Sequence, residues 1–341
     1  MASQKVLYLE AKHGAFAVGT RDIQKPGPGE LLVKVKASGV NPVEWKIQTW
    51  GIIVEKYPAI LGSDVAGDVE AVGEGVQGFS IGDKVVLQAN FADNDFAGYQ
   101  QFTKVPAEIV AKIPDNISYT QAASIPSGLA TASIGLLASS SAGLNPSFDK
   151  SVQSTGPALV IGGSSTVGAF AIQVLKFSGF SPIITYASGH HADYLKSIGA
   201  THVIDRKAVA IADLPSETKK IANGPVKTVF DAVSGPDTQE AGYETLAEGG
   251  GIVVVLPKSV KNVVDSKKIY EPFGSFHAPF NREFGVKILS QLTQLLSDGT
   301  FVPHNTEEVP GGLAGVAEAL EKLKTNQVSG KKLIVLPQET K

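Results

Sequence analysis

The most constraining feature of the sequence is an apolar segment, 157–161, followed directly by the glycine-rich turn 162–168 and an apolar helical pattern over 167–178. A strand that is apolar throughout, without alternation, is typical of a parallel sheet buried on both faces. Further apolar segments follow at 182–186, 201–204, 227–231 and 251–256, and residues 193–198 have a helical pattern that ends at Gly199. This alternation predicts an α/β fold with a doubly wound parallel sheet and right-handed crossovers.

The first third of the chain has a different pattern. Residues 30–37 alternate apolar and charged side chains, 65–72 repeat the alternation, and 81–87 follow a Gly-Asp turn. Short strands between glycines and prolines predict a small antiparallel barrel. Near the C-terminus, helices are expected at 284–296 and 313–323, and the last strand, 331–336, is expected to return to the first domain. The Ser/Gly-rich stretch 139–156 is expected to be a long loop.

Composition excludes several classes of protein. A chain of 341 residues suggests two domains, and a net charge of −3 gives no basic surface for nucleic acid. The absence of cysteine removes disulfides, thiolate nucleophiles and thiolate metal sites. No secretory signal is visible at the N-terminus, so a cytoplasmic location is expected. Residues 116–175 carry only two charges, but prolines, serines and glycines interrupt them, so no membrane span is expected.

The turn after the first parallel strand is a candidate dinucleotide site. Gly163, Ser165 and Gly168 match G-x-G-x-x-G with serine in place of the middle glycine. In that position a pyrophosphate rests on the backbone N–H groups of a helix N-terminus. A phosphate-binding P-loop would need a lysine, and a hydrolase elbow would need G-x-S-x-G, and neither is present. A glycine turn without a ligand stays open as an alternative.

The end of the second parallel strand bears on the choice between NAD and NADP. An acidic side chain usually binds the ribose 2′-OH of NAD there, and residues 185–191 contain none. Asp193 lies nearby but is expected to begin and cap the next helix. The sequence therefore favours NADPH. The candidates for binding its 2′-phosphate are one hydroxyl and three basic side chains: Ser188, His190, His191 and Arg206. For the two histidines, a solvated position in a loop without a ligand is an equal alternative.

Six segments together resemble zinc-independent medium-chain dehydrogenases/reductases: 38–46, 58–69, 72–76, 82–85, 162–168 and 329–335. The chain is most similar to enoyl reductases of the fungal trans-acting, polyketide-associated type, within the quinone-oxidoreductase-like branch, over essentially its whole length. The resemblance implies a β-rich GroES-like catalytic domain interrupted by a Rossmann domain that binds NADP(H). The implied boundaries are 1–126 with 285–341 for the first domain and 127–284 for the second.

The resemblance also bears on metal and reaction. Zinc alcohol dehydrogenases of this superfamily place a cysteine ligand where this chain has Asn41 and a histidine where it has Ser63, and neither residue is a good zinc ligand. No metal site is therefore expected. The implied reaction is hydride transfer from NADPH to the β-carbon of an α,β-unsaturated carbonyl or enoyl thioester.

Site residues follow from the same resemblance. Residues near the nicotinamide half of the cofactor would be Pro42, Val43, Glu44, Trp45 and Lys46, flanked by Val255 and Leu256, with Val328 and Ser329 closing over it. The pyrophosphate would be covered by Ser164, Ser165, Thr166 and Val167. Substrate would lie along two stretches, Gly128, Leu129, Thr131 and Ser133 on one and Phe273, Gly274, Phe276 and His277 on the other.

Two side chains are candidates for catalysis. Lys46 would stabilise the developing enolate, or would simply bind cofactor or face solvent. Thr131 would place a hydroxyl near the substrate carbonyl, or would be a structural threonine inside a helix. Trp45 and Phe276 would shape an apolar pocket or belong to the core, and His277 would face the pocket or the surface. No residue is required to protonate the α-carbon, and solvent could do so.

Rival functions share this scaffold. An NADPH quinone oxidoreductase would differ only in its substrate pocket, and a non-catalytic NADPH-binding protein is a third reading because fold does not fix function. The expected partners are a small enoyl or enal substrate and, in the trans-acting reading, a carrier protein of a polyketide synthase. A monomer and a homodimer are both compatible with the sequence.

Overall fold

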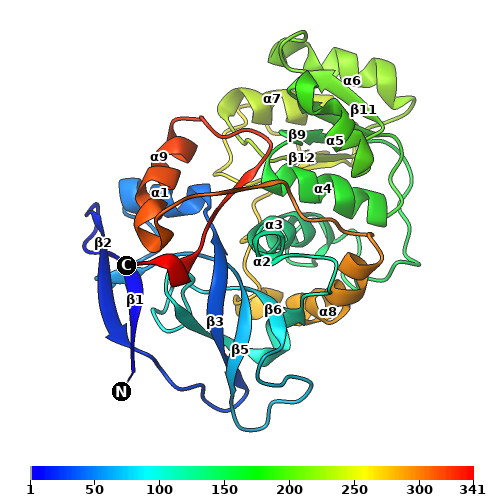
Figure 1. Cartoon of the computed structure of the whole chain (residues 1–341). Helices are drawn as coiled ribbons and strands as arrows, with labels where there is room; N and C mark the ends of the chain where they lie inside the picture. The colour runs from blue at the N-terminus through cyan, green and yellow to red at the C-terminus, as the bar shows by residue number, and fades with distance from the viewer. Residues whose placement is uncertain (1) are drawn as a thin grey trace. The chain divides into compact units, whose positions relative to one another are not determined.

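The computed structural model describes residues 2–341 and divides the chain into two compact units (Figure 1). Unit 1 comprises Met1–Ser127 and Ile288–Lys341, and unit 2 comprises Gly128–Lys287. Unit 2 is therefore inserted into the sequence of unit 1. Within residues 2–341, no helix combines the length and apolar composition that a membrane crossing needs.

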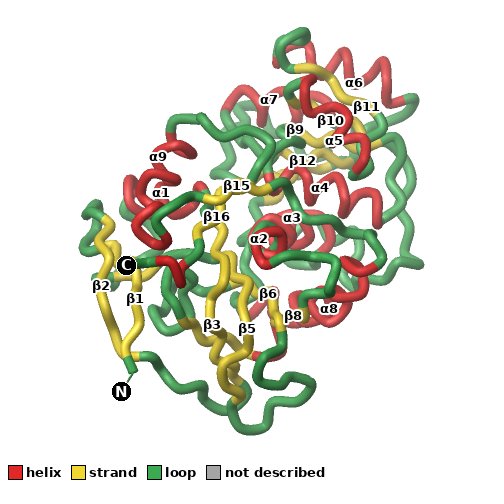
Figure 2. Tube along the Cα trace, viewed as in Figure 1, coloured by secondary structure: helices red, strands yellow, loops and turns green. Residues whose placement is uncertain are grey.

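Unit 1 is built on two sheets. The larger has the order β15-β16-β3-β5-β6-β8, with β7 also paired to β3, and the smaller has the order β2-β1-β4. Figure 2 shows the long strands β3 and β5 side by side. The strands are β1 (Ser3–Leu9), β2 (Phe16–Asp22), β3 (Glu30–Gly39), β4 (Ala59–Ile60), β5 (Asp64–Val72), β6 (Lys84–Gln88), β7 (Phe102–Pro106), β8 (Val110–Lys112), β15 (Thr306–Glu308) and β16 (Lys332–Val335).

The last strand returns to the first part of the chain, as the sequence predicts. β16 pairs antiparallel with β3, placing Ile334 opposite Gly39 and Val335 opposite Ser38. Antiparallel pairing of β3 with β5, and of β5 with β6, confirms the antiparallel character expected from the alternating segments. β6 begins three residues later than predicted because Gly82, at φ +90°, forms a turn first.

Among the described residues of unit 1, the helices that lie wholly in this unit are α1 (Pro42–Trp50), α2 (Tyr119–Ala122) and α9 (Val316–Lys324). α1 and α9 bury apolar side chains in the same core as β1 and β16, including Ile47, Leu320 and Val335. The expected helix at 313–323 is split, because its first turn is a 3-10 segment, Gly312–Gly315, that begins at a left-handed glycine. α3 (Pro126–Leu137) and α8 (Pro279–Ser297) carry the chain from one unit to the other.

Unit 2 contains a six-stranded sheet that is parallel throughout, in the order β11-β10-β9-β12-β13-β14. In chain order within the unit this is 3-2-1-4-5-6, the doubly wound Rossmann arrangement, whose switch point lies between β9 and β12. The strands are β9 (Ala158–Ile161), β10 (Ile183–Ala187), β11 (His202–Asp205), β12 (Thr228–Asp231), β13 (Gly251–Val254) and β14 (Lys268–Tyr270).

Helices cover both faces of this sheet. α6 (Leu214–Ala222) and α7 (Pro236–Thr245) share one core with Leu159 and Ile161 of β9, and α4 (Thr166–Phe177) packs on the opposite side of β9 and β12 (Figure 1). α5 (Ala192–Ser197) packs beside β11. The predicted strands of this unit and its two predicted helices, 167–178 and 193–198, are present. The sequence did not indicate α3, α6 or α7, and it missed β14, a three-residue edge strand too short to show a pattern.

Candidate functional site

In unit 2, the turn between β9 and α4 has the geometry of a dinucleotide-binding turn. Gly162 follows the strand at φ +78°, a conformation that favours glycine. Ser165, in place of the usual middle glycine, is the N-cap of α4: its hydroxyl donates to the Gly162 carbonyl at 2.8 Å and accepts from the Gly168 amide at 3.0 Å. Where the usual glycine would give the backbone conformational freedom, Ser165 instead caps the helix with its side chain and so fixes the turn.

The two remaining glycines of the turn are required by close packing. A Cβ on Gly163 would lie 2.1 Å from the Thr185 hydroxyl, and a Cβ on Gly168 would lie 2.2 Å from the Gly162 carbonyl oxygen. These approaches bring strand, turn and helix together as a dinucleotide fold requires. Residues 164–167 stay half-buried at the start of the twelve-residue helix α4, where backbone N–H groups and the helix dipole favour an anion. This cradle fits a pyrophosphate.

Beyond β10, the structure brings together Ser188 and Arg206, two of the residues predicted for the 2′-phosphate. The Arg206 Nε donates to the Ser188 hydroxyl at 2.7 Å, and the Arg206 backbone N–H donates to the Ala187 carbonyl. Arg206 is exposed, whereas Ser188 is buried. A guanidinium with further N–H donors beside a hydroxyl suits a phosphate oxygen.

The two predicted histidines follow in the 3-10 turn Gly189–His191, with ring centroids 3.8 Å apart. Burial, then the neighbouring His190 and Arg206, lowers the pKa of His191 below its ordinary value. His191 is therefore poorly suited to provide a positive charge for a phosphate. The Arg206 guanidinium provides that charge. Asp205, which the sequence reading did not select, accepts hydrogen bonds from the backbone N–H groups of Gly189 and Lys207, and these hold the pKa of its carboxyl low. Its carboxylate fixes the turn that carries the histidines.

A buried hydrogen-bond chain holds the ends of β12 and β13 together. Ser234, in the left-handed conformation at φ 54°, donates its hydroxyl to the Asp231 carbonyl at 2.7 Å and accepts from the Val255 amide at 2.8 Å. The Asp231 side chain accepts from the amides of Val233 and Ser234. Val255, predicted to flank the nicotinamide, is thus held by Ser234, which belongs to no recognisable sequence motif. Leu256, the next residue, is half-buried.

The two predicted substrate stretches meet in unit 2. A Cβ on Gly274 would lie 2.5 Å from the Thr131 hydroxyl, so the backbone of one stretch packs directly on the other. Asn281, which is fully buried, holds the second stretch by donating to the Phe273 carbonyl at 2.8 Å and the Ser275 carbonyl at 3.2 Å. The sequence did not single out Asn281, since a lone asparagine three residues before the predicted helix 284–296 carries no signal.

Members of these stretches differ in accessibility. Leu129, Ser133 and Phe276 are at most 2 % exposed, and the Ser133 hydroxyl donates to the Leu129 carbonyl of its own helix. Gly128 packs against α4, while Thr131, Gly274 and His277 are half-buried and Phe273 is 54 % exposed. Within unit 2, Phe276 belongs to the core, where it packs against Gly285.

In unit 1, the predicted nicotinamide segment is the first part of α1. Asn41 is the N-cap, Pro42 takes the first helical position, and the Glu44 carboxylate accepts the Asn41 backbone N–H at 2.5 Å. Glu44 is fully buried, and burial raises the pKa of its carboxyl to about 8. Glu44 is therefore inaccessible and fixes the start of the helix, whereas Pro42 is exposed and Val43 packs against the unit 1 core.

The Lys46 ammonium lies over two indole rings of the same helix. Its ammonium is 5.6 Å from the Trp45 ring centroid and 5.7 Å from that of Trp50, and the two rings meet edge to face at 5.6 Å. Burial lowers the pKa of Lys46 below its ordinary value. The aromatic faces attract the cation while restricting its position. A positioned ammonium of this kind can stabilise negative charge on an oxygen.

Asn41 and Ser63, the positions at which the resemblance implies ligands in zinc alcohol dehydrogenases, are adjacent in space. The Asn41 amide Nδ2 donates to the Ser63 hydroxyl at 3.1 Å and to Asp64 at 2.9 Å. An amide nitrogen that donates hydrogen bonds has no lone pair for a metal, so this donor set does not fit zinc. Across residues 2–341, no group of three or more His, Asp or Glu side chains is arranged to hold a metal ion.

The closing segment from the C-terminal part of the chain lies between α9 and β16. Val328 packs against the unit 1 core, and Ser329 is exposed.

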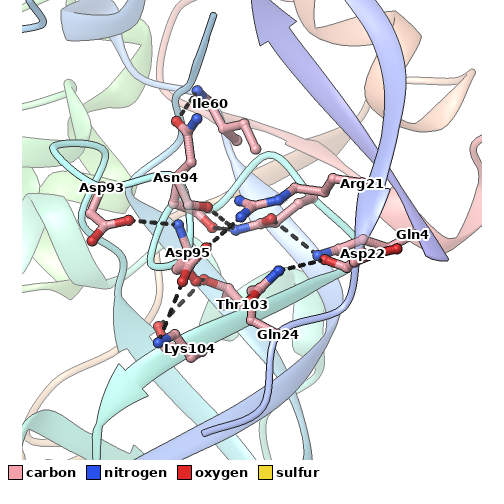
Figure 3. A network of polar contacts seen from close by, with 12 residues as sticks. Gln4, Arg21, Asp22, Gln24, Ile60, Asp93, Asn94, Asp95, Thr103 and Lys104 are labelled. Atoms are coloured by element: carbon pink, nitrogen blue, oxygen red, sulfur yellow. Dashed lines mark hydrogen bonds and ion pairs between the residues drawn. The ribbon is translucent and has the colours of Figure 1, made fainter. Parts of the chain in front are cut away.

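Unit 1 also contains a cavity of about 510 Å³, bounded by residues 53–56 and 91–95 and by Arg21. Figure 3 shows a polar network that includes lining residues of this cavity. In it the Asp95 carboxylate is paired with both Arg21 and Lys104. Lys104 pairs in addition with Glu30 at 3.3 Å. Because these charges compensate one another, the network stabilises the walls of the cavity and gives no reason to place a charged ligand there.

Comparisons with known proteins agree with the two-part architecture. Residues 27–115 match the family "Alcohol dehydrogenase GroES-like domain", and residues 166–269 match the family "Zinc-binding dehydrogenase". The trans-enoyl reductase grgB of a Penicillium species is 30% identical and covers 96% of this chain and 97% of its own length. The trans-enoyl reductase himH of Aspergillus japonicus is 31% identical, with 98% and 97% covered. The chain belongs to the medium-chain dehydrogenase/reductase superfamily.

Membership of this superfamily confirms the resemblance inferred from the sequence and makes the chain an oxidoreductase. A mycobacterial protein solved in complex with NADPH shares the fold, with a TM-score of 0.77, 24% identity, and coverage of 98% of this chain and 100% of its own. The β-rich unit and the parallel sheet are thus the two domains that the superfamily combines.

Proposed function

We propose that the protein is an NADPH-dependent, zinc-independent reductase that adds hydride to the β-carbon of an α,β-unsaturated carbonyl or enoyl thioester. The observation that carries this proposal is the hydrogen bond from the Asn41 side-chain amide to the Ser63 hydroxyl. These two residues stand where alcohol-oxidising relatives need zinc ligands, and neither is a zinc ligand. A carbonyl substrate must then rely on a protein cation or hydroxyl for polarisation. The relatives named trans-enoyl reductase, which match nearly the whole chain, support the same reaction.

NADPH is the cofactor we infer. Bound NADPH would supply a hydride from its nicotinamide. The residues that would hold it are those of the α4 turn for the pyrophosphate and Ser188 with Arg206 for the 2′-phosphate. The NADPH complex of the mycobacterial protein of the same fold supports this choice.

Lys46 is the candidate for stabilising the enolate that forms as hydride adds to the conjugated system. Its ammonium lies over two indole rings on α1, whose faces attract a cation. Thr131 is a second candidate, because its half-buried hydroxyl sits at the junction of the two predicted substrate stretches. In this proposal the positive charge of Lys46 stabilises the enolate oxygen and the Thr131 hydroxyl orients it. Solvent supplies the proton for the α-carbon.

The acyl thioester would be presented free or on a carrier protein of a polyketide synthase. A quinone oxidoreductase is the alternative that the same scaffold allows, and a non-catalytic NADPH-binding protein is the third. All three predict NADPH binding, so only turnover separates them.

The deciding experiment follows NADPH oxidation by chelator-treated protein with a 2-alkenal, a 2-enoyl thioester and a quinone, with NADH in parallel. Turnover of the enal or thioester, with NADPH preferred, is the expected result. Turnover of the quinone alone would replace this proposal with the quinone reductase. Tight NADPH binding without turnover of any acceptor would contradict a general double-bond reductase and favour the non-catalytic reading.

A further inference from the structure

The unit 1 core contains a buried lysine that the site described above does not use. Lys332, the first residue of β16, is 4 % exposed, and its Nζ lies 2.6 Å from Oδ2 of Asp64, which is fully buried. The same ammonium donates to the side-chain oxygen of Asn41. A buried ammonium is stable only when paired and hydrogen-bonded, and here both acceptors are provided by the fold.

The strand arrangement brings these groups together. β16, β3 and β5 are consecutive in the sheet, with Gly39 of β3 opposite Ile334 on one side and opposite Asp64 on the other. A Cβ on Gly39 would lie 2.8 Å from the Lys332 Cε and 3.0 Å from the Asp64 Cβ. The missing side chain of Gly39 therefore makes the room through which the lysine reaches Asp64.

Lys332, Asp64 and Asn41 form a buried polar cluster, and Asn41 connects it to the start of α1. Asn41, the N-cap, accepts from Lys332 through its Oδ1 and donates through its Nδ2 to Asp64. Glu44 accepts the Asn41 backbone N–H, and the Val40 backbone N–H donates to the Leu333 carbonyl of β16 at 2.9 Å. The first turn of α1 is thus tied to β16 through both main chain and side chains.

We propose that Lys332 is a positioning residue: by joining Asn41 to Asp64, its ammonium holds the first turn of α1 and so sets the place of Lys46, one helical turn further on. The proposal for its catalytic consequence rests on the proposed function. The positioning itself is a property of unit 1 alone.

The physical reason is the cost of leaving buried groups unpaired. Without the ammonium, the Asp64 carboxylate loses its counter-ion and the Asn41 side-chain carbonyl loses its donor, although both residues are buried. We expect the start of α1 to move so that these groups find other partners. This movement costs the least free energy because α1 is only nine residues long and its last residues, Thr49 and Trp50, are exposed. Displacement of the helix start displaces Lys46.

The chain provides its own probe of α1. It contains two tryptophans, Trp45 and Trp50, and both are on this helix. The indole N–H of Trp45 is buried and has no hydrogen-bond partner within residues 2–341, so movement of the helix start would expose it to water. Intrinsic tryptophan emission and its quenching by acrylamide therefore report on α1 without any substrate or cofactor.

The test compares Lys332→Met with Lys331→Met. Lys331 is the neighbouring lysine, exposed at the surface and paired with Glu307, so the same chemical change there leaves the buried cluster intact. Lys332→Met is expected to give red-shifted emission, stronger quenching, and a kcat lower by about 10- to 100-fold, as displacements near 1 Å produce. Lys331→Met is expected to match the parent protein in all three.

A second variant guards against loss of folding. Lys332→Met/Asp64→Asn removes both buried charges, so no uncompensated carboxylate remains, while an amide oxygen still accepts the Ser127 backbone N–H. It is expected to fold and to keep the tryptophan red shift, because Asn41 loses the Lys332 ammonium and also the Asp64 oxygen that accepts its Nδ2. Unchanged emission and quenching in a folded Lys332 variant would overturn the proposal. Failure of both variants to fold, with Lys331→Met folded, would also overturn it and assign Lys332 to the stability of the whole unit.

The outcome is separable from the proposed function. If no acceptor is turned over by the parent protein, the emission and quenching measurements still decide whether Lys332 positions α1. If an enal or thioester is turned over and the Lys332 variants retain both their kcat and their tryptophan signals, the reductase stands and the positioning role fails.

Discussion

The Nε of Arg206 donates a hydrogen bond to the Ser188 hydroxyl at 2.7 Å, which joins the residue after β11 to the residue after β10. The pair stands at the tip of the second strand of the parallel sheet, where this fold distinguishes NAD from NADP. Using Nε for Ser188 leaves the terminal guanidinium nitrogens for a phosphate, and the serine hydroxyl keeps its own proton to donate.

Arg206→Met is expected to raise KM for NADPH by about 10- to 100-fold, the range for loss of a charged hydrogen bond, and to leave KM for NADH nearly unchanged. The 2′-phosphate is the only group that the two cofactors do not share. Initial rates with both cofactors measure the effect. Lys207→Met changes the adjacent exposed lysine and serves as the control. An equal rise in KM for both cofactors would show that Arg206 does not contact the 2′-phosphate.

Lys46→Met is expected to lower kcat by about 10²- to 10³-fold, the loss seen when a single stabiliser of an oxyanion is removed. Methionine keeps much of the apolar stem that packs on the two indole rings, so KM for NADPH should change little. Lys56→Met, at an exposed lysine of the same unit, is the control. A kcat within about threefold of the parent value would remove Lys46 from the chemistry and leave it with a binding role only.

The pH profile gives an independent check on Lys46. Because burial lowers the pKa of its ammonium, the side chain loses its charge at a lower pH than an exposed lysine, whose pKa is about 10.4. If the charge is required, kcat should fall on the alkaline side below that value, and the fall should be absent from the residual activity of Lys46→Met. A profile of the same shape in both proteins would contradict a catalytic charge at Lys46.

Gly163→Ala is expected to destabilise the protein by about 1–3 kcal/mol, the cost of overpacking a close contact. The new Cβ would lie 2.1 Å from the hydroxyl of Thr185, a fully buried side chain on β10 that cannot swing away. Gly224→Ala is the matched control, since the nearest atom to its Cβ would be 4.0 Å away. Urea unfolding of both variants gives the comparison, and equal unfolding free energies would show that the turn relaxes more freely than its packing indicates.

How far the sequence predicted these features depended on whether a residue's role was local. The turn 162–168 could be read because strand, glycines and helix follow one another, and the structure adds only that Ser165 acts as the N-cap. The return of β16 to β3 could be inferred because a strand after two helices cannot easily rejoin the parallel sheet.

Contacts made by single polar side chains gave no such signal. Lys332 meets Asn41 across 291 positions, and Ser234 meets Val255 through a single hydroxyl. Asn281 holds Phe273 from within a helix. Each of these residues is of a common polar type. Although Lys332 lies in the segment 329–335 that carries the resemblance, nothing in the sequence marks it, Ser234 or Asn281 as buried and paired, and only packing in the folded chain makes them so. The polar core of the candidate site was therefore hidden from the sequence, although its glycine-rich frame was not.

Glu44 provides the last prediction, which concerns stability and pH. Its carboxyl is fully buried beside Asp64, Tyr99 and Lys332, and burial raises its pKa from 4.5 to about 8 in the folded protein. Between these two values the folded state holds a proton that the unfolded state has released. The free energy of unfolding therefore falls as pH rises from about 4.5 to about 8, with a slope from this group approaching 1.4 kcal/mol per pH unit.

Glu44→Gln removes this titration and keeps an amide oxygen to accept the Asn41 backbone N–H. Urea unfolding at several pH values between about 5 and 8 should show a flatter pH dependence for Glu44→Gln than for the parent protein. Glu55→Gln, at an exposed glutamate of the same unit, should keep the parent slope. If Glu44→Gln and the parent protein lose stability in parallel over this range, Glu44 is already ionised at neutral pH. The Lys332 ammonium would then balance two buried carboxylates instead of one, and Lys332→Met would leave two negative charges uncompensated at the start of α1.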